Sequence, residues 1–120
     1  MNPQVGSAKI VVEPLNIYYT YVVVRKDIPH VYQIIQAAHA VQEQALKFPT
    51  PTGGTNHMVL LKAKDADQLM THTVSVRDKD INMLLFYEPD YDTGFTAAAS
   101  EPLHKDDPRR AAFRALEMYR

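Results

Sequence analysis

The densest acidic stretch of the chain follows an apolar segment and offers the best candidates for acid–base chemistry. Glu88, Asp90 and Asp92 occupy alternate positions, with Tyr91 among them. General-base catalysis favours a carboxylate with a raised pKa that can reach water or a hydroxyl, and the end of an apolar strand suits this role. We therefore predict that Glu88 is a catalytic base or a water-orienting group, the alternative being a solvated turn.

The segment DIPHVYQIIQAAHAV, residues 27–41, predicts the start of a helix. Pro29 suits the first helical turn because its missing N–H would have no partner there, and Asp27 can cap the helix. His30 then lies near the positive end of the helix, where an anion is favoured. We predict that His30 is a general base or a phosphate contact, or else an exposed histidine of the capping region.

Three polar side chains follow along one side of this helix, at steps of four and three residues: Tyr32, Gln36 and His39. Tyr32 could stack on a nucleotide base and Gln36 could bond to its edge, or both could pack at the edge of the core. His39 is flanked by apolar positions, which favours a half-buried histidine bonded to backbone over a ligand contact. Apolar positions recur at steps of three and four and predict the buried stripe of the helix, namely Val31, Ile34, Ile35, Ala38, Val41 and Ala45.

The remaining pattern alternates strands and helices. Each strand is predicted from an apolar or β-branched run and each helix from a cap followed by apolar periodicity. The expected order is strand 17–24, helix 29–48, strand 57–63, helix 65–76, strand 80–88, strand 95–100 and a closing helix from Pro108 capped by Asp106 or Asp107. We predict an α/β fold with a mixed, about four-stranded sheet and helices packed on both faces. Residues 1–16 are expected to be an N-terminal arm or edge strand, and 17–120 the core of a single domain.

Composition narrows the classes of protein. The net charge of −1 argues against a global basic field of the kind that binds nucleic acid nonspecifically. The absence of cysteine excludes disulfides and thiolate nucleophiles. No leader or membrane-spanning run is recognisable, so we expect a cytoplasmic protein without membrane contact. The five histidines are not closely paired and the acidic stretch lacks a calcium-loop pattern, so we predict neither a metal nor a cofactor.

Five segments, taken together and in order, resemble the type 2 peptidyl-tRNA hydrolases. YVVVRKD is similar to the family's first strand, which ends in V-V-R-x-D, and QAAHAV to its Q-x-x-H-A helix motif. HMVLLKAKDADQL resembles the K-V-V-L-K strand with its acidic helix start. INMLLFYEPD stands in place of the strand that ends in D-A-G, and FTAAASEP resembles the closing T-V-L-A-I-G-P strand. The resemblance spans residues 17–102.

The resemblance implies metal-independent hydrolysis of the ester that joins a peptide to the 3′ end of tRNA, and a homodimer. Arg25 and Asp27 match the end of the family's first strand, and Gln36 and His39 match its helix motif. These residues, with the neighbouring Lys26, are the expected substrate-binding side chains.

The acidic end of the site carries over as well. Glu88 stands where the family has its Asp, Thr96 matches the Thr that opens the last strand, and Thr93 is a loose stand-in for a second family Thr. Under the resemblance Thr96 would position the nucleophile beside Glu88.

The chain departs from the family just before the helix. The family's Gly-Lys-Gly-Lys segment is absent, and His30 and Tyr32 fall where its two lysines would stand. Contact with phosphate would then depend on His30 and Arg25. The lost lysines motivate a second hypothesis, a module that sequesters a small nucleotide such as a cyclic signalling nucleotide, or a phosphodiesterase acting on one, of the kind a phage would encode.

Overall fold

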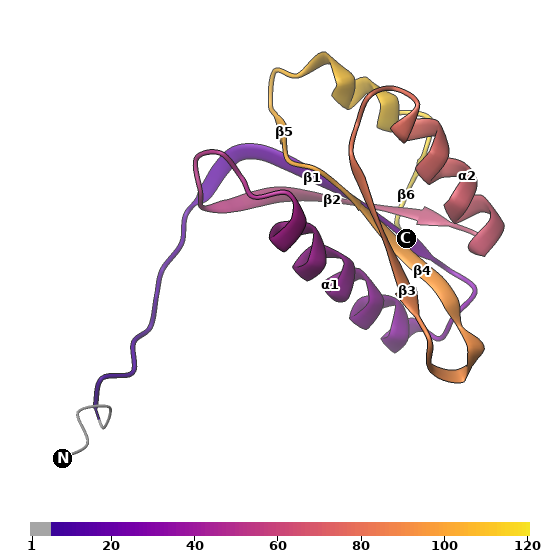
Figure 1. Ribbon diagram of the computed structural model, residues 1–120, viewed down its shortest axis with the longest axis horizontal. Coiled ribbons are helices and arrows are strands. Elements are labelled where there is room, and N and C mark those ends of the chain that lie inside the picture. The colour runs from indigo at the N-terminus through magenta and orange to yellow at the C-terminus, as the bar shows by residue number, and fades with distance from the viewer. Residues whose placement is uncertain (1–5) are drawn as a thin grey trace.

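The computed structural model, which describes residues 6–120, has one six-stranded mixed sheet with a helix on each face (Figure 1). The strand order is β3-β4-β1-β2-β6, and β5 pairs with the first half of β1. The elements, in chain order, are β1 (Leu15–Arg25), α1 (His30–Lys47), β2 (Thr55–Ala63), α2 (Ala66–Arg77), β3 (Met83–Glu88), the 3-10 turn η1 (Asp90–Asp92), β4 (Gly94–Ser100), β5 (Leu103–His104), the 3-10 helix η2 (Pro108–Phe113) and β6 (Glu117–Met118).

β1 is the central strand, as its nearly all apolar run over residues 17–24 predicts. It pairs in parallel with β2, where Val22 faces Leu60, and antiparallel with β4, where Val23 faces Ala98. β4 contributes three consecutive alanines, residues 97–99, all fully buried. Because an alanine side chain rises little above the sheet, α1 and α2 both pack closely over this strand from opposite sides.

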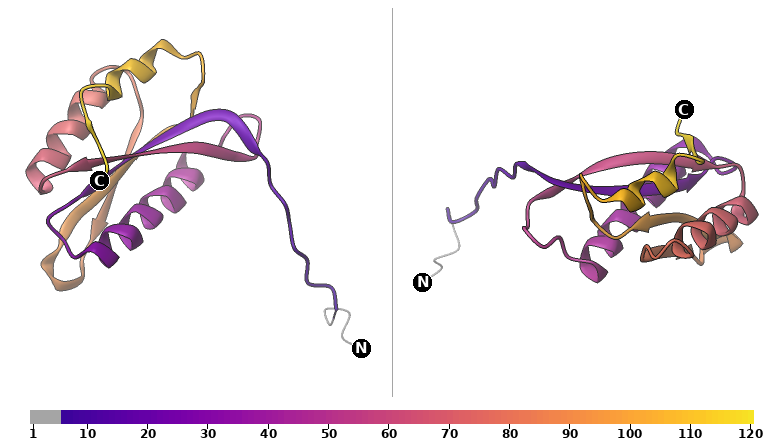
Figure 2. Two further views of the ribbon diagram at one scale, coloured as in Figure 1. Left: turned by 180° about the vertical axis from the view of Figure 1, so that it is seen from behind. Right: turned by 90° about the horizontal axis from the view of Figure 1, so that it is seen from above.

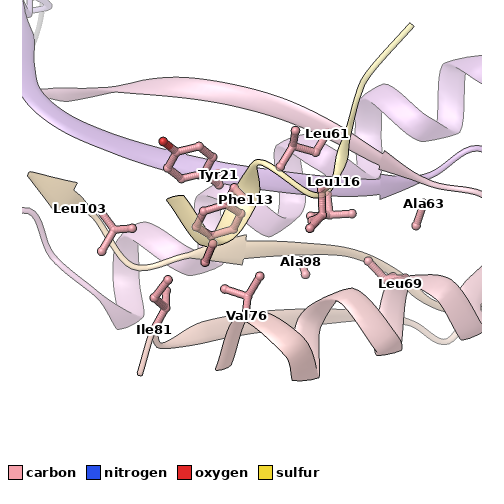
Figure 3. Close-up of a cluster of buried hydrophobic side chains, with 12 residues drawn as sticks. Tyr21, Leu61, Ala63, Leu69, Val76, Ile81, Ala98, Leu103, Phe113 and Leu116 are labelled. Atoms are coloured by element: carbon pink, nitrogen blue, oxygen red, sulfur yellow. The ribbon is translucent and has the colours of Figure 1, made fainter. Parts of the chain in front are cut away.

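The larger core lies between the sheet and the layer formed by α2 and η2 (Figure 3). Leu69 and Val76 of α2 are buried there, and Phe113 of η2 stacks on Tyr21 of β1 with ring centroids 4.0 Å apart. Asp65 caps α2, as predicted, because its side chain accepts a hydrogen bond from the backbone N–H of Gln68 at 2.8 Å.

The predicted mixed α/β fold with helices on both faces is confirmed, but the count of about four strands is wrong. The two additional strands, β5 and β6, are two residues long each and leave no periodic pattern in the sequence. Asp107 caps the segment from Pro108 as expected, yet that segment is the short η2 and not a full helix. Residues 6–14 form no strand and extend away from the sheet (Figure 1). The first five residues of the predicted arm lie outside the described part of the chain.

Helix α1 has the predicted bounds within about one residue, but the predicted orientation is wrong. Its side chains buried against the sheet are Gln33, Gln36, Ala40 and Gln44. The predicted buried stripe faces outward: Val31, Ile34, Ile35, Ala38 and Ala45 are exposed, and Val41 is half-buried. The helix also lacks the predicted Asp27 cap, because Pro29 is at the N-cap position and forms no side-chain cap.

No helix within residues 6–120 combines the length and the apolar character that crossing a membrane requires.

The core predicts one stability test. Leu69 is fully buried on α2, so Leu69→Ala should lower the free energy of unfolding by about 2–5 kcal/mol through lost burial and a residual cavity. The neighbouring Met70 is 37% exposed, and Met70→Ala should change stability by less than about 0.5 kcal/mol. Urea denaturation of both variants would measure the difference, and equal losses would contradict the assigned core.

Candidate functional site

Gln36 is the central residue of the candidate site. Its side-chain amide is buried between α1 and the sheet and forms hydrogen bonds with two strands. The amide oxygen accepts a hydrogen bond from Thr96 Oγ1 of β4 at 2.8 Å, and the amide nitrogen donates to Glu88 Oε2 of β3 at 3.2 Å. Since the threonine hydroxyl can donate and the carboxylate can only accept, these two partners fix which way the amide points.

Glu88 is held as an anion. The backbone N–H of Asp90 donates to Glu88 Oε1 at 3.1 Å, and this bond, followed by that of Gln36, holds the pKa of Glu88 below its usual value. The sequence-based expectation of a raised pKa is therefore wrong. The reason is that β3 ends in a turn whose own backbone reaches back to the carboxylate, which no strand pattern reveals. An ionised carboxylate in this position can orient water or accept a hydrogen bond from a ligand.

A pocket of about 410 Å³ opens between α1 and the turn after β3. Its lining is mostly apolar and includes the Gln36–Glu88 pair and the half-exposed Tyr32. The lining residues are Ile28, Pro29, Tyr32, Ile35, Gln36, Glu88, Asp90, Tyr91 and Thr93. Among the described residues, no lysine, arginine or histidine lines this pocket. The site therefore suits a ligand with an apolar or planar part and a group that donates to carboxylates.

The turn that closes the pocket is conformationally strained. Tyr91 and Asp92 both have left-handed backbone angles, with φ of 54° and 56°, which side chains other than glycine rarely adopt. Thr93 ties the turn together, because its Oγ1 donates to the backbone oxygen of Asp90 at 2.7 Å. Tyr91 is 97% exposed beside the pocket, so its ring is free to contact a ligand.

Arg25 is fully used within the protein. Its Nε and Nη2 donate to Asp27 at 2.8 and 2.9 Å, and its Nη1 donates to the backbone oxygens of Thr93 and Phe95 at 2.7 and 3.1 Å. This pairing raises the pKa of Arg25 and lowers that of Asp27. The predicted phosphate contact by Arg25 is not what the geometry provides, since the guanidinium instead fastens the start of β4 to the end of β1.

His30 and Lys26 lie away from the Glu88 pocket, on the other side of α1. His30 Nδ1 is 3.3 Å from the hydroxyl of Tyr119, which donates to Gln33 Oε1 at 2.7 Å. The amine of Lys26 lies 4.3 Å from the centre of the Tyr119 ring. The sequence-based site is thus divided by the helix, and His30 is not placed to work with Glu88. Sequence reasoning missed Tyr119 because its contacts come from the far end of the chain.

The other predicted residues have mixed outcomes. Thr96 is fully buried and its hydroxyl donates to Gln36, so it does not reach the pocket directly. Thr93 does line the pocket.

His39 is exposed and its ring stacks on Phe86 with centroids 5.2 Å apart, so the predicted half-buried histidine bonded to backbone is wrong. Sequence reasoning missed Ile28 and Ile35 as pocket walls, although Ile35 shares the helical spacing of Tyr32 and Gln36.

Within residues 6–120, the His, Asp and Glu side chains form no group of three that could hold a metal ion.

Comparison with known proteins gives information on the fold of this chain and none on its chemistry. No protein-family model matches the chain, and no curated relative is found by sequence. The fold is similar to the solved structure of a protein of unknown function from Agrobacterium tumefaciens, with a TM-score of 0.57 at 8% sequence identity. The match covers 88% of this chain and 99% of the other. At this identity the likeness shows a shared α/β fold alone.

The Gln36 bridge predicts a measurable pKa change. Gln36→Met keeps the side-chain length but removes the amide donor, so the pKa of Glu88 should rise toward its ordinary value. Titration of the Glu88 carboxyl carbon by NMR measures this shift. Gln42→Met, an exposed position of the same helix, is the matched control and should leave the pKa unchanged.

Proposed function

We propose that the protein is a metal-independent hydrolase of peptidyl-tRNA, or of a related nucleotide-containing substrate, with a type 2 peptidyl-tRNA hydrolase-like fold. One observation carries the proposal: side chains named by the family-like motifs converge on a single connected network. Arg25, Gln36, Glu88 and Thr96 come from four different elements, and hydrogen bonds join them through the turn after β3. If these residues matched the family's motifs by chance alone, we would not expect them to lie close together in the fold.

The proposed reaction is ester hydrolysis with Glu88 as base. Glu88 orients a water and takes its proton as the water oxygen attacks the ester carbonyl carbon. The tetrahedral intermediate then collapses, the bond to the ribose oxygen breaks, and that oxygen receives the proton from Glu88. A free peptide and a tRNA with an intact 3′ hydroxyl are released. Gln36 holds the carboxylate in place, and Tyr32 and Tyr91 present rings on which a terminal base can stack.

A second candidate is nucleotide binding without turnover, because binding alone requires no group that stabilises a developing oxyanion. The lining residues of the Glu88 pocket in the described chain include no cation, so an oxyanion or a phosphate has no charged partner there. The same feature weakens the variant in which the protein is a phosphodiesterase, because that reaction develops negative charge on phosphoryl oxygens. A ligand held by its base and its hydroxyl groups fits the pocket without needing such a partner.

The deciding experiment follows both products and binding. The purified protein is incubated with N-acetylaminoacyl-tRNA and with mono-, di- and cyclic nucleotides, while gel electrophoresis, chromatography and calorimetry record cleavage and binding heat. We expect release of free tRNA, and Glu88→Gln should lower kcat by about 100-fold or more through loss of the base. Asp78→Asn, an exposed carboxylate at the end of α2, is the control and should retain full activity. Tight nucleotide binding with every substrate intact would refute hydrolysis and establish the second candidate.

The pH dependence of the reaction provides an independent test. Because hydrogen bonds lower the pKa of Glu88, its active ionised form should persist below the ordinary glutamate pKa of about 4.3, and activity should fall only as the pH drops through the lowered value. In Gln36→Met the fall should begin at higher pH. An acid limb that is unchanged in this variant would rule out Glu88 as the titrating base.

A further inference from the structure

A second pocket, of about 500 Å³ and here called the η2 pocket, lies on the face of the sheet opposite α1. It opens between η2 and β2, where the chain returns from η2 and pairs with the edge of β2 as β6 (Figure 2). Its apolar lining includes Leu61 and Leu116, both drawn in Figure 3, and Met118. In the described chain it shares no lining residue with the Glu88 pocket, and its volume is within the range of small-molecule sites.

Three cationic side chains line the η2 pocket without carboxylate partners. Lys105 and Arg114 are exposed, and Arg110 is half-buried. Within residues 6–120, none of the three forms an ion pair. Cations that are brought together repel one another, so a group of three without a counter-charge favours a bound anion.

The two carboxylates that line the same pocket do not neutralise this group. Asp107 accepts from Arg109 Nη2 at 2.8 Å, and Arg109 lies outside the lining. The side chain of Asp106 is 78% exposed, and its carboxylate lies 3.9 Å from Nδ1 of His104. The η2 pocket is therefore cationic although the whole chain has a net charge of −1, and its charge is opposite in sign to that of the Glu88 pocket.

Arg110 is already held in one orientation by the protein. Its Nε donates to the hydroxyl oxygen of Tyr21 at 2.9 Å, and its Nη1 donates to the backbone oxygen of Lys105. The guanidinium carbon lies 3.9 Å from the centre of the Tyr19 ring, a cation–π contact that fixes the plane of the group. Within the described chain Nη2 forms no hydrogen bond, so its donors are available on a pre-oriented side chain.

Tyr21 supplies a second observation that points to a ligand. Only 6% of this residue is exposed, and its hydroxyl oxygen accepts the hydrogen bond from Arg110. In residues 6–120 the hydroxyl proton itself has no acceptor. A buried donor is costly to leave unpaired, and Tyr21 lines the η2 pocket, so an oxygen atom of a ligand there would satisfy it.

We propose that the η2 pocket binds a small phosphate monoester whose apolar or planar part packs against Leu61, Leu116 and Met118. A phosphate monoester carries a charge of about −1.5 to −2 at pH 7 and three acceptor oxygens, which suits a group of cations beside a hydroxyl donor. An arginine fork can also bind two phosphate oxygens at once. The site is separate from the hydrolase proposed above, because it lies on the other face of the sheet and uses different residues.

The extent of the positive charge favours a small ligand over a strand of RNA. Single-stranded RNA is bound along grooves whose cations follow the backbone over several nucleotides. Here the neighbouring cation of η2, Arg109, is bound to Asp107 and lies 4.0 Å from Glu101. The positive charge of the pocket therefore does not continue along η2.

Titration of the full-length protein with phenyl phosphate, followed by NMR, tests the proposal. The backbone amide signals of η2 and β6 should shift and saturate, with a Kd on the order of 1 mM or tighter, while the signal of Gln36 stays in place. Inorganic phosphate lacks the apolar part and should bind at the same residues about 10-fold more weakly. These measurements involve no tRNA and no Glu88, so their outcome is independent of the proposed hydrolysis.

Two substitutions test the assigned donors. Arg114→Gln changes an exposed residue, so it should fold normally by circular dichroism and raise the Kd for phenyl phosphate about 10-fold. Tyr21→Phe removes the buried hydroxyl and should also weaken binding. Arg77→Gln removes the same charge from the exposed end of α2, where the arginine is paired with Asp78, and as the matched control it should leave the Kd unchanged.

Three results would overturn the proposal. The first is the absence of saturable shifts at about 10 mM phenyl phosphate, a concentration well above the expected Kd. The second is an equal loss of affinity in Arg77→Gln and Arg114→Gln, which would indicate attraction by the overall charge and no defined site. The third is tighter binding of a short RNA without a terminal phosphate, which would assign the cations to an RNA strand.

Discussion

The buried glutamines of α1 are the constraint on which the rest of the structure depends. A primary amide carries donors and an acceptor, so its burial is costly unless both ends find partners. Gln33 and Gln36 find them, whereas the buried side-chain nitrogen of Gln44 has no hydrogen-bond partner among the described residues. Gln36 satisfies this between Thr96 and Glu88, and Gln33 does so between Tyr119 and the backbone oxygens of Lys26 and Ile28. These bonds fix the rotation of the helix about its axis. A helix with its polar side against the sheet must turn its apolar side outward.

The same bonds assemble the candidate site. With α1 fixed by Gln36, the carboxylate of Glu88 is held under the helix, and the strained turn at Tyr91 closes over it. Arg25 forms an ion pair with Asp27 and holds the start of β4 in place. Its positive charge is therefore neutralised by Asp27 and does not line the pocket. The pocket itself is therefore acidic and partly apolar. This electrostatic character restricts the proposed chemistry more than the shape of the pocket does, because negative charge on a ligand meets no counter-charge there.

The two surfaces of α1 are close neighbours. Ile35 lines the Glu88 pocket and also lies on the exposed apolar stripe, and Ile34 lines a groove between α1 and β2 on the other side. The groove on that side holds His30 and Tyr119. One helix thus supplies a polar face to the sheet, residues to a pocket and an apolar face to solvent.

The sequence by itself determined the parts of this protein that depend on local signals. Residues 17–24 read as a central strand because an apolar run suits burial on both faces, the Asp65 cap followed from its position, and Pro29 located the start of α1 to within one residue. The short strands β5 and β6 carried no such signal. Only the tertiary structure decided which face of α1 is buried, because periodicity locates an apolar stripe without stating what covers it. It also separated His30 from Glu88 and lowered the pKa of Glu88, since both outcomes depend on contacts between segments distant in the chain.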